Sequence, residues 1–157
     1  MKTADLQSLQ ALRELREQRA SSRLAAQQAL CRETRTELDQ AREALQLHRE
    51  RLAREAEDVF GRFSEGLSVS AWRAAQDELQ RLEDEGRQLQ GRTEDAEHTV
   101  QTEEQTRQQL RQEHLARQQK TVAWGSLLEQ RVRRDARIGE QRDESDELPG
   151  STPEAAR

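Results

Sequence analysis

The sequence predicts an all-α protein: a long antiparallel two-helix coiled-coil hairpin with a disordered C-terminal tail. Three observations predict this fold. The composition is too polar for a globular core, two long runs of helix-forming residues carry apolar residues at heptad spacing, and a cluster of Gly, Ser and aromatic residues separates the runs at residues 60–72. Together they favour two helices joined by a single reversal of the chain.

The composition excludes a compact domain. Only 32% of the 157 residues are hydrophobic and 36% are charged, which is too little apolar side chain to enclose a core of this size. Such a composition fits either a disordered chain or an elongated coiled coil, and abundant Ala, Leu, Glu, Gln and Arg favour the coil. Both prolines, Pro149 and Pro153, lie in the final stretch, whereas a disordered chain would carry more of them.

Charge and cysteine content set further limits. The net charge of −5 gives no general case for nucleic-acid binding. The single cysteine, Cys31, excludes an internal disulfide and fits a reducing compartment. The N-terminus lacks an apolar signal core, and no segment reaches the length of a membrane span. We therefore expect a soluble, cytoplasmic protein without direct membrane insertion.

The first helix is predicted over residues 4–60, since residues 4–59 contain neither Gly nor Pro. Apolar residues recur every seven positions from Leu24 onward, with small or polar residues between them. This ladder consists of Leu24, Cys31, Leu38, Leu45, Leu52 and Val59. Before Leu24 the pattern changes phase, which leaves four leucines near the N-terminus for some other contact. These are Leu6, Leu9, Leu12 and Leu15.

The turn is predicted over residues 61–68, where Gly61 or Gly66 can adopt the positive φ that ends a helix. Ser68 or Ser70 can cap the helix that follows. With Ser68 as the cap, Leu67 and Trp72 occupy the two positions of a hydrophobic staple.

The second helix is predicted over residues 69–138 and repeats the heptad spacing. One antiparallel register, centred on residue 67, aligns both ladders along their length. Its apolar layers pair Val59 with Ala75, Leu52 with Leu82, Leu45 with Leu89, and Leu38 with Ala96. Cys31 opposite Glu103 is a poor layer, and His48 is expected to face Gly86. We expect the hairpin (residues 1–138) to be least stable near these polar and glycine layers.

A basic cluster lies near the end of the second helix, and an acidic run through Glu147 follows it. The cluster consists of Arg131, Arg133, Arg134 and Arg137. The register places it beside the N-terminal end, near Arg13, Arg16, Arg19 and Arg23. Residues 139–157 contain Gly, Pro, Ser and alternating charge, which predicts a disordered tail.

Catalysis is not expected. Cys31 occupies a core heptad position, where a buried thiol lacks thiolate character. The three histidines are spread along the chain with no companion ligand at metal spacing. No phosphate-binding loop, nucleophile elbow or paired carboxylate is present. The sequence therefore predicts no enzyme activity, no metal and no cofactor.

The arginine-rich end is the candidate partner-binding surface. Trp124 lies beside Gly125 within an apolar patch, and aromatic residues next to arginines are typical of interface hot spots. The candidate residues are Arg13, Arg16, Trp124, Arg131, Arg133, Arg134 and Arg137. The alternative for any single arginine is a solvated coiled-coil face. A basic-zipper mode of DNA binding competes poorly, because the cluster is short, lacks Asn and precedes an acidic run.

Three blocks of sequence resemble the YscO/FliJ (SctO-type) group of bacterial type III secretion proteins. They are a leucine- and arginine-rich opening (residues 9–29), a serine-initiated helix start with tryptophan (68–82), and a basic-to-acidic C-terminus (116–147). The resemblance covers nearly the whole chain up to about residue 147.

The resemblance implies a cytoplasmic stalk that is peripheral to the inner-membrane secretion apparatus. In that family the terminal end inserts into the hexameric secretion ATPase. It also contacts the export gate protein and secretion chaperones or a needle-length regulator. If this chain behaves as the family does, the resemblance implies that the candidate arginines face the ATPase and the gate. The alternative is a generic coiled-coil scaffold or oligomerisation protein without a secretion role.

Overall fold

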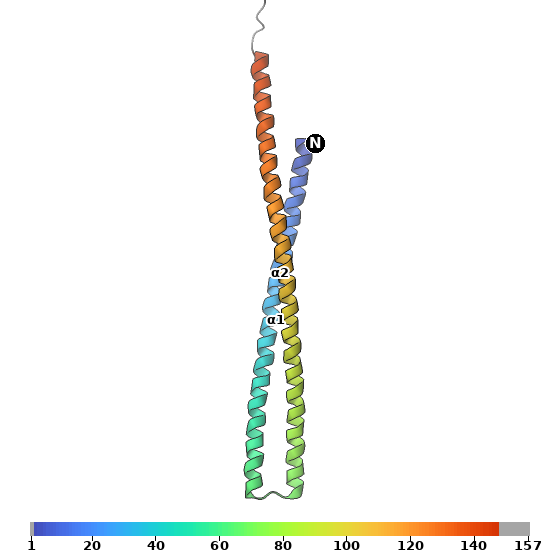
Figure 1. Cartoon of the computed structure of the whole chain (residues 1–157), viewed down its shortest axis with the longest axis vertical. Helices are drawn as coiled ribbons and strands as arrows, with labels where there is room; N and C mark the ends of the chain where they lie inside the picture. Colours follow the sequence, from blue (N-terminus) through green and yellow to red (C-terminus); the bar gives the residue numbers. More distant parts are fainter. Residues whose placement is uncertain (1, 148–157) are drawn as a thin grey trace, which may run out of the picture. The chain divides into compact units, whose positions relative to one another are not determined.

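The computed structural model describes residues 2–147 and contains two α-helices, α1 (Thr3–Glu65) and α2 (Val69–Glu147). Residues 66–68 join them, and the two helices run antiparallel as a hairpin (Figure 1). The predicted all-α hairpin is therefore confirmed. The chain divides into two compact units. We call residues 23–110 the turn unit, and residues 2–22 with 111–147 the terminal unit.

Both helices extend further than predicted. The sequence placed the end of the first helix at residue 60, but α1 continues through Gly61 to Glu65. A single glycine inside a helix costs about 1 kcal/mol relative to Ala, which neighbouring turns can absorb. The chain leaves the helix at Gly66, whose φ of 98° lies in the left-handed region that favours glycine.

The turn closes through a serine cap and an aromatic pair. The backbone N–H of Ala71 donates to Oγ of Ser68 at 3.2 Å, which confirms Ser68 as the N-cap of α2. The ring of Trp72 packs against Phe63 from the last turn of α1, with 5.1 Å between ring centroids. Leu67 is half-buried, and its predicted staple with Trp72 stays a prediction.

The far end of α2 also differs from the prediction. Residues 139–147, assigned to the disordered tail, continue α2 to Glu147. Glu, Gln and Arg make up most of this segment, and they support a helix better than the single Gly139 opposes one. The rest of the predicted tail, residues 148–157, lies outside the described residues.

The seam of the turn unit follows the predicted register. The buried apolar residues on its α1 side are the ladder members Cys31, Leu38, Leu45 and Val59. From α2, Leu82 is completely buried. His48 lies against Gly86, and Cys31 bonds to the backbone of Glu103. Two layers predicted from the sequence are therefore present as contacts.

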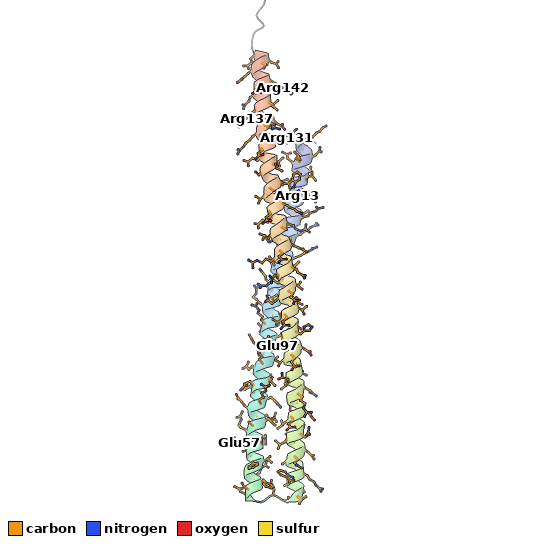
Figure 2. The ribbon with its side chains drawn as sticks, in the orientation of Figure 1. Arg13, Glu57, Glu97, Arg131, Arg137 and Arg142 are labelled. Carbon is orange, nitrogen blue, oxygen red and sulfur yellow. The ribbon has the colours of Figure 1, made fainter. Side chains whose placement is uncertain are left out.

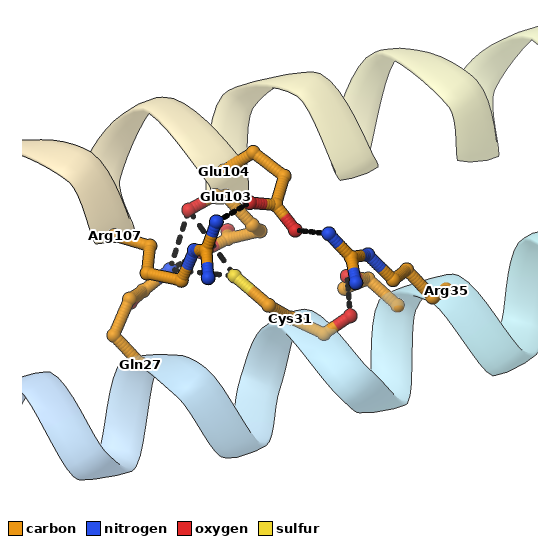
Figure 3. Close-up of polar contacts among 7 residues, drawn as sticks. Gln27, Cys31, Arg35, Glu103, Glu104 and Arg107 are labelled. Atoms are coloured by element: carbon orange, nitrogen blue, oxygen red, sulfur yellow. Dashed lines mark hydrogen bonds and ion pairs between the residues drawn. The ribbon is translucent and has the colours of Figure 1, made fainter.

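A polar layer interrupts the apolar seam of the turn unit (Figure 3). The side-chain amide of Gln27 donates to the backbone carbonyl of Glu103 at 3.0 Å and also to its carboxylate. The thiol of Cys31 donates to the same carbonyl at 3.4 Å. Glu104 pairs with Arg35 across the helices and with Arg107 on its own helix. The poor layer predicted at Cys31 is thus filled by hydrogen bonds and ion pairs.

In the terminal unit the seam keeps its heptad spacing, although the sequence pattern changes phase. Ala20 is buried and Leu6, Gln10, Arg13 and Glu17 are half-buried. The leucines between them face outward: Leu9, Leu12 and Leu15 are 37%, 42% and 43% exposed. Since α1 is one uninterrupted helix, its inward positions continue at the same spacing whatever residues occupy them.

Candidate partner-binding end

All seven candidate residues lie in the terminal unit. Arg13 and Arg16 belong to α1, and Trp124 and the four-arginine cluster belong to α2. Figure 2 shows Arg131 and Arg137 along the C-terminal part of α2, with Arg13 on the neighbouring part of α1. The structure separates the candidates into two groups, one around Trp124 and one from Arg131 to Arg137. The predicted position of the basic cluster near Arg13 and Arg16 is wrong, because Thr3 of α1 donates to Asp135 within the cluster, whereas Arg13 contacts Trp124.

The first group is built on a cation–π contact. The guanidinium carbon of Arg13 lies 4.5 Å from the ring centroid of Trp124, within the range in which the ring face attracts a cation. Gln10, one turn earlier on α1, donates from its side-chain amide to the backbone carbonyl of Thr121 at 3.3 Å. These contacts connect α1 to α2 where the seam has few apolar residues.

Only part of the Trp124 side chain is therefore available to a binding partner. The sequence predicted an apolar patch around it, and Val122 and Leu127 are indeed exposed, at 67% and 54%. The indole itself is half-buried, and Arg13 contacts one of its faces. The exposed apolar surface of the patch consequently belongs to the aliphatic residues more than to Trp124.

The second group forms a shallow basic depression of about 540 Å³ on α2. All four arginines of the cluster line it, together with apolar and amide side chains. The lining residues are Leu127, Gln130, Arg131, Arg133, Arg134, Arg137 and Ile138. Periodicity explains this grouping, because Leu127, Arg131, Arg134 and Ile138 recur at intervals of three or four and so share one face of the helix.

The four arginines differ in their ion pairs. Arg131 pairs with Asp135 at 3.3 Å, and Arg133 pairs with Glu129 at 2.6 Å. Within residues 2–147, Arg134 and Arg137 form no ion pair. Two of the four arginines are therefore paired with acids one turn away on α2, at Asp135 and Glu129. Arg134 and Arg137 present the free charge of this depression.

Two further cations, Arg117 and Lys120, were not among the predicted site residues and lie on α2 opposite Arg13 and Arg16. The signal was available in the predicted register, which places Thr121 opposite Arg13. Arg117 and Lys120 then follow from helical spacing. The four cations line a common groove within the terminal unit.

The described part of the chain offers no metal centre: no group of three or more His, Cys, Asp or Glu side chains within residues 2–147 is arranged to hold an ion. None of the described helices is long and apolar enough to cross a membrane.

These features define a class of protein, the long helical hairpin with an arginine-rich terminal unit. Among solved structures, the fold is similar to that of the type III secretion protein YscO from Vibrio parahaemolyticus. The TM-score is 0.81, the alignment covers 94% of each chain, and the sequences are 18% identical. At this identity the similarity establishes a common fold. No protein-family model matches the chain, and no curated protein matches it by sequence.

Proposed function

We propose that the protein is a non-enzymatic central-stalk or escort component of a type III secretion ATPase complex. In this role it links the hexameric ATPase to the export gate protein and binds secretion chaperones or a needle-length regulator. It works in the cytoplasm, peripheral to the inner-membrane apparatus. The observation that carries the proposal is the hairpin fold in common with a type III secretion protein over 94% of both chains.

The charge arrangement of the terminal unit supports a binding role for this end. Exposed apolar side chains, Leu127 and Ile138, alternate with the unpaired arginines Arg134 and Arg137. Such a surface fits a partner that offers carboxylates around an apolar centre. Arginine rather than lysine suits this role, because its planar fork pairs bidentately with carboxylates.

The test is stimulation of the ATPase from the same secretion system. The variant Arg134→Glu/Arg137→Glu reverses the two unpaired charges and is expected to abolish stimulation. Reversal of all four arginines, at 131, 133, 134 and 137, extends the test to the paired ones. The matched control is Arg73→Glu/Arg92→Glu, since both arginines are exposed and form no ion pair within residues 2–147. The control is expected to stimulate as the unmodified protein does. If the protein binds neither the ATPase, nor the gate protein, nor the chaperones, the proposal is wrong.

A second candidate is a coiled-coil scaffold that self-associates without a secretion role. The exposed leucines of α1, Leu9, Leu12 and Leu15, favour it, because self-association would cover them. Light scattering after size-exclusion chromatography separates the two proposals. The stalk role predicts a monomer, whereas the scaffold predicts a dimer that dissociates on Leu9→Ser/Leu12→Ser substitution.

A further inference from the structure

A groove between α1 and α2 in the terminal unit is lined mainly by cations. Its volume is about 280 Å³, close to the lower end of the range for small-molecule sites. Both helices contribute basic side chains, and the lining contains one carboxylate. The lining residues are Arg13, Arg16, Glu113, Ala116, Arg117, Lys120 and Thr121.

The four cations of this groove are not paired with carboxylates on the described part of the chain. Within residues 2–147, Arg13, Arg16, Arg117 and Lys120 form no ion pair, whereas Arg35 and Arg42 pair with glutamates across the helices. Glu113 is the single acid in the lining. Like charges that line one groove repel one another, so the groove attracts an anion.

Arg13 also contributes an unused hydrogen-bond donor. Its Nε atom is buried and has no hydrogen-bond acceptor within the described residues. A buried donor without an acceptor is unfavourable and unusual in folded proteins. The contact with Trp124 holds the guanidinium in place from one side. Arg13 is therefore positioned in the seam with hydrogen-bonding capacity that the protein leaves unused.

We propose that this groove binds a phosphoryl anion of the pyrophosphate class. Guanidinium groups pair bidentately with phosphate oxygens, and a lysine ammonium adds a point charge. A single carboxylate would neutralise one of the four cations. Each phosphate group carries about 1.5 to 2 negative charges near neutral pH, so two linked groups match the charge that remains after Glu113. The groove volume is also larger than a single carboxyl group would fill.

Binding has a structural consequence within the terminal unit. An anion that contacts Arg13 and Arg16 on α1 and Arg117 and Lys120 on α2 bridges the two helices. A ligand that binds only the folded state stabilises it in proportion to its concentration. Because Arg13 contacts Trp124, movement of the guanidinium toward the anion also changes the environment of the indole. Anion binding in this groove does not depend on the secretion role.

The experiment is a titration of the full chain with inorganic pyrophosphate at constant ionic strength, followed by calorimetry and tryptophan fluorescence. Saturable binding of one anion per chain is expected. The variant Arg16→Gln/Lys120→Gln keeps Arg13 on Trp124 and removes one cation from each helix. It is expected to weaken binding at least about tenfold, since each charge-assisted hydrogen bond contributes strongly. The control, Arg73→Gln/Arg92→Gln, changes the net charge equally and should keep the affinity within about twofold.

Each other outcome overturns the proposal. Absence of saturable binding removes the site, and equal weakening in both variants assigns the effect to diffuse charge. Tighter binding of a short glutamate peptide than of pyrophosphate assigns the groove to acidic protein segments. Parallel titrations with ADP and with phosphatidylcholine vesicles carrying phosphatidylinositol bisphosphate identify the source of the phosphoryl group, again through loss in Arg16→Gln/Lys120→Gln.

Discussion

His48 of α1 and Gly86 of α2 face each other so closely that even a methyl side chain at residue 86 would crowd the imidazole ring. A Cβ atom at Gly86 would lie 3.2 Å from both Cδ2 and Nε2 of His48. The same Nε2 lies 2.7 Å from the carbonyl oxygen of Leu82. Since a carbonyl only accepts, Nε2 carries the proton and donates it. The glycine thus allows a buried histidine to bond to the backbone of the other helix.

Two glycines of α2 are expected to respond differently to alanine. Glycine inside a helix costs about 1 kcal/mol relative to alanine. Gly91→Ala should recover most of this, because a Cβ there meets nothing within 4 Å. Gly86→Ala should gain little or destabilise, because His48 must move away from Leu82. Urea unfolding followed by circular dichroism measures both changes, and equal stabilisation by the two variants would contradict the close contact.

Leu82 is expected to be the most sensitive apolar position of the turn unit. Its side chain is completely buried, and truncating a buried leucine to alanine costs about 2–5 kcal/mol. Leu82→Ala should therefore lower the midpoint of thermal unfolding strongly. Leu47→Ala is the matched control, since Leu47 is 56% exposed and exposed positions change stability by about 0.5 kcal/mol or less. Comparable losses at the two positions would mean that the seam is misplaced.

The register was predictable because apolar ladders in both helices allow one alignment that buries both. Cys31, Leu38, Leu45 and Val59 are buried at the predicted spacing, and the glycine layer at His48 lies where the alignment puts it. The removal of apolar area from water contributes most of the free energy that selects this alignment. The part of the fold that follows from it could therefore be predicted from composition and periodicity alone.

The terminal unit was less predictable because periodicity and apolar character disagree there. The apolar character of Leu9, Leu12 and Leu15 would favour their burial, but they are exposed. Gln10 and Arg13 face the seam instead. The continuity of α1 decides which residues face the seam, and this continuity is a property of the whole helix. The register and helical spacing place Lys120 near Arg16, but only the structure shows that the two side chains line one groove.

The polar layer of the turn unit is expected to protect the thiol of Cys31. Cys31 is 4% exposed, and Gln27 and Glu103 close the seam beside it. Glu103→Ala removes the carboxylate that accepts from Gln27, so local opening becomes easier. We expect thiol modification by a disulfide reagent to accelerate about 10- to 150-fold, the equivalent of losing one charged hydrogen bond.

The matched control for this layer is Glu97→Ala. Glu97 also pairs across the helices, with Arg42 at 3.0 Å, but both side chains are well exposed. Exposed ion pairs contribute little to stability, so the modification rate of Cys31 should stay within about twofold of the unmodified protein. An equal acceleration in both variants would indicate general loosening of the hairpin rather than opening at Cys31.

Glu78 is expected to give the turn unit part of its sensitivity to acid. Two hydrogen bonds from Arg81, at 3.0 and 2.7 Å, lower the pKa of Glu78 below its ordinary value of 4.5. The loss of hydration around the carboxyl opposes this shift, and the positive charges of Arg81 and Arg51 add to it. A carboxyl whose pKa is lower in the folded state stabilises the fold above the pKa of the unfolded chain. This contribution is lost as the pH falls through the folded-state value.

Because the pair is exposed, salt should weaken the effect. Urea unfolding of the unmodified protein and of Glu78→Gln, measured from neutral pH to below 4.5, should differ at neutral pH and converge in acid. Arg81→Gln should converge in the same range, and a difference that persists or grows in acid would contradict the assignment.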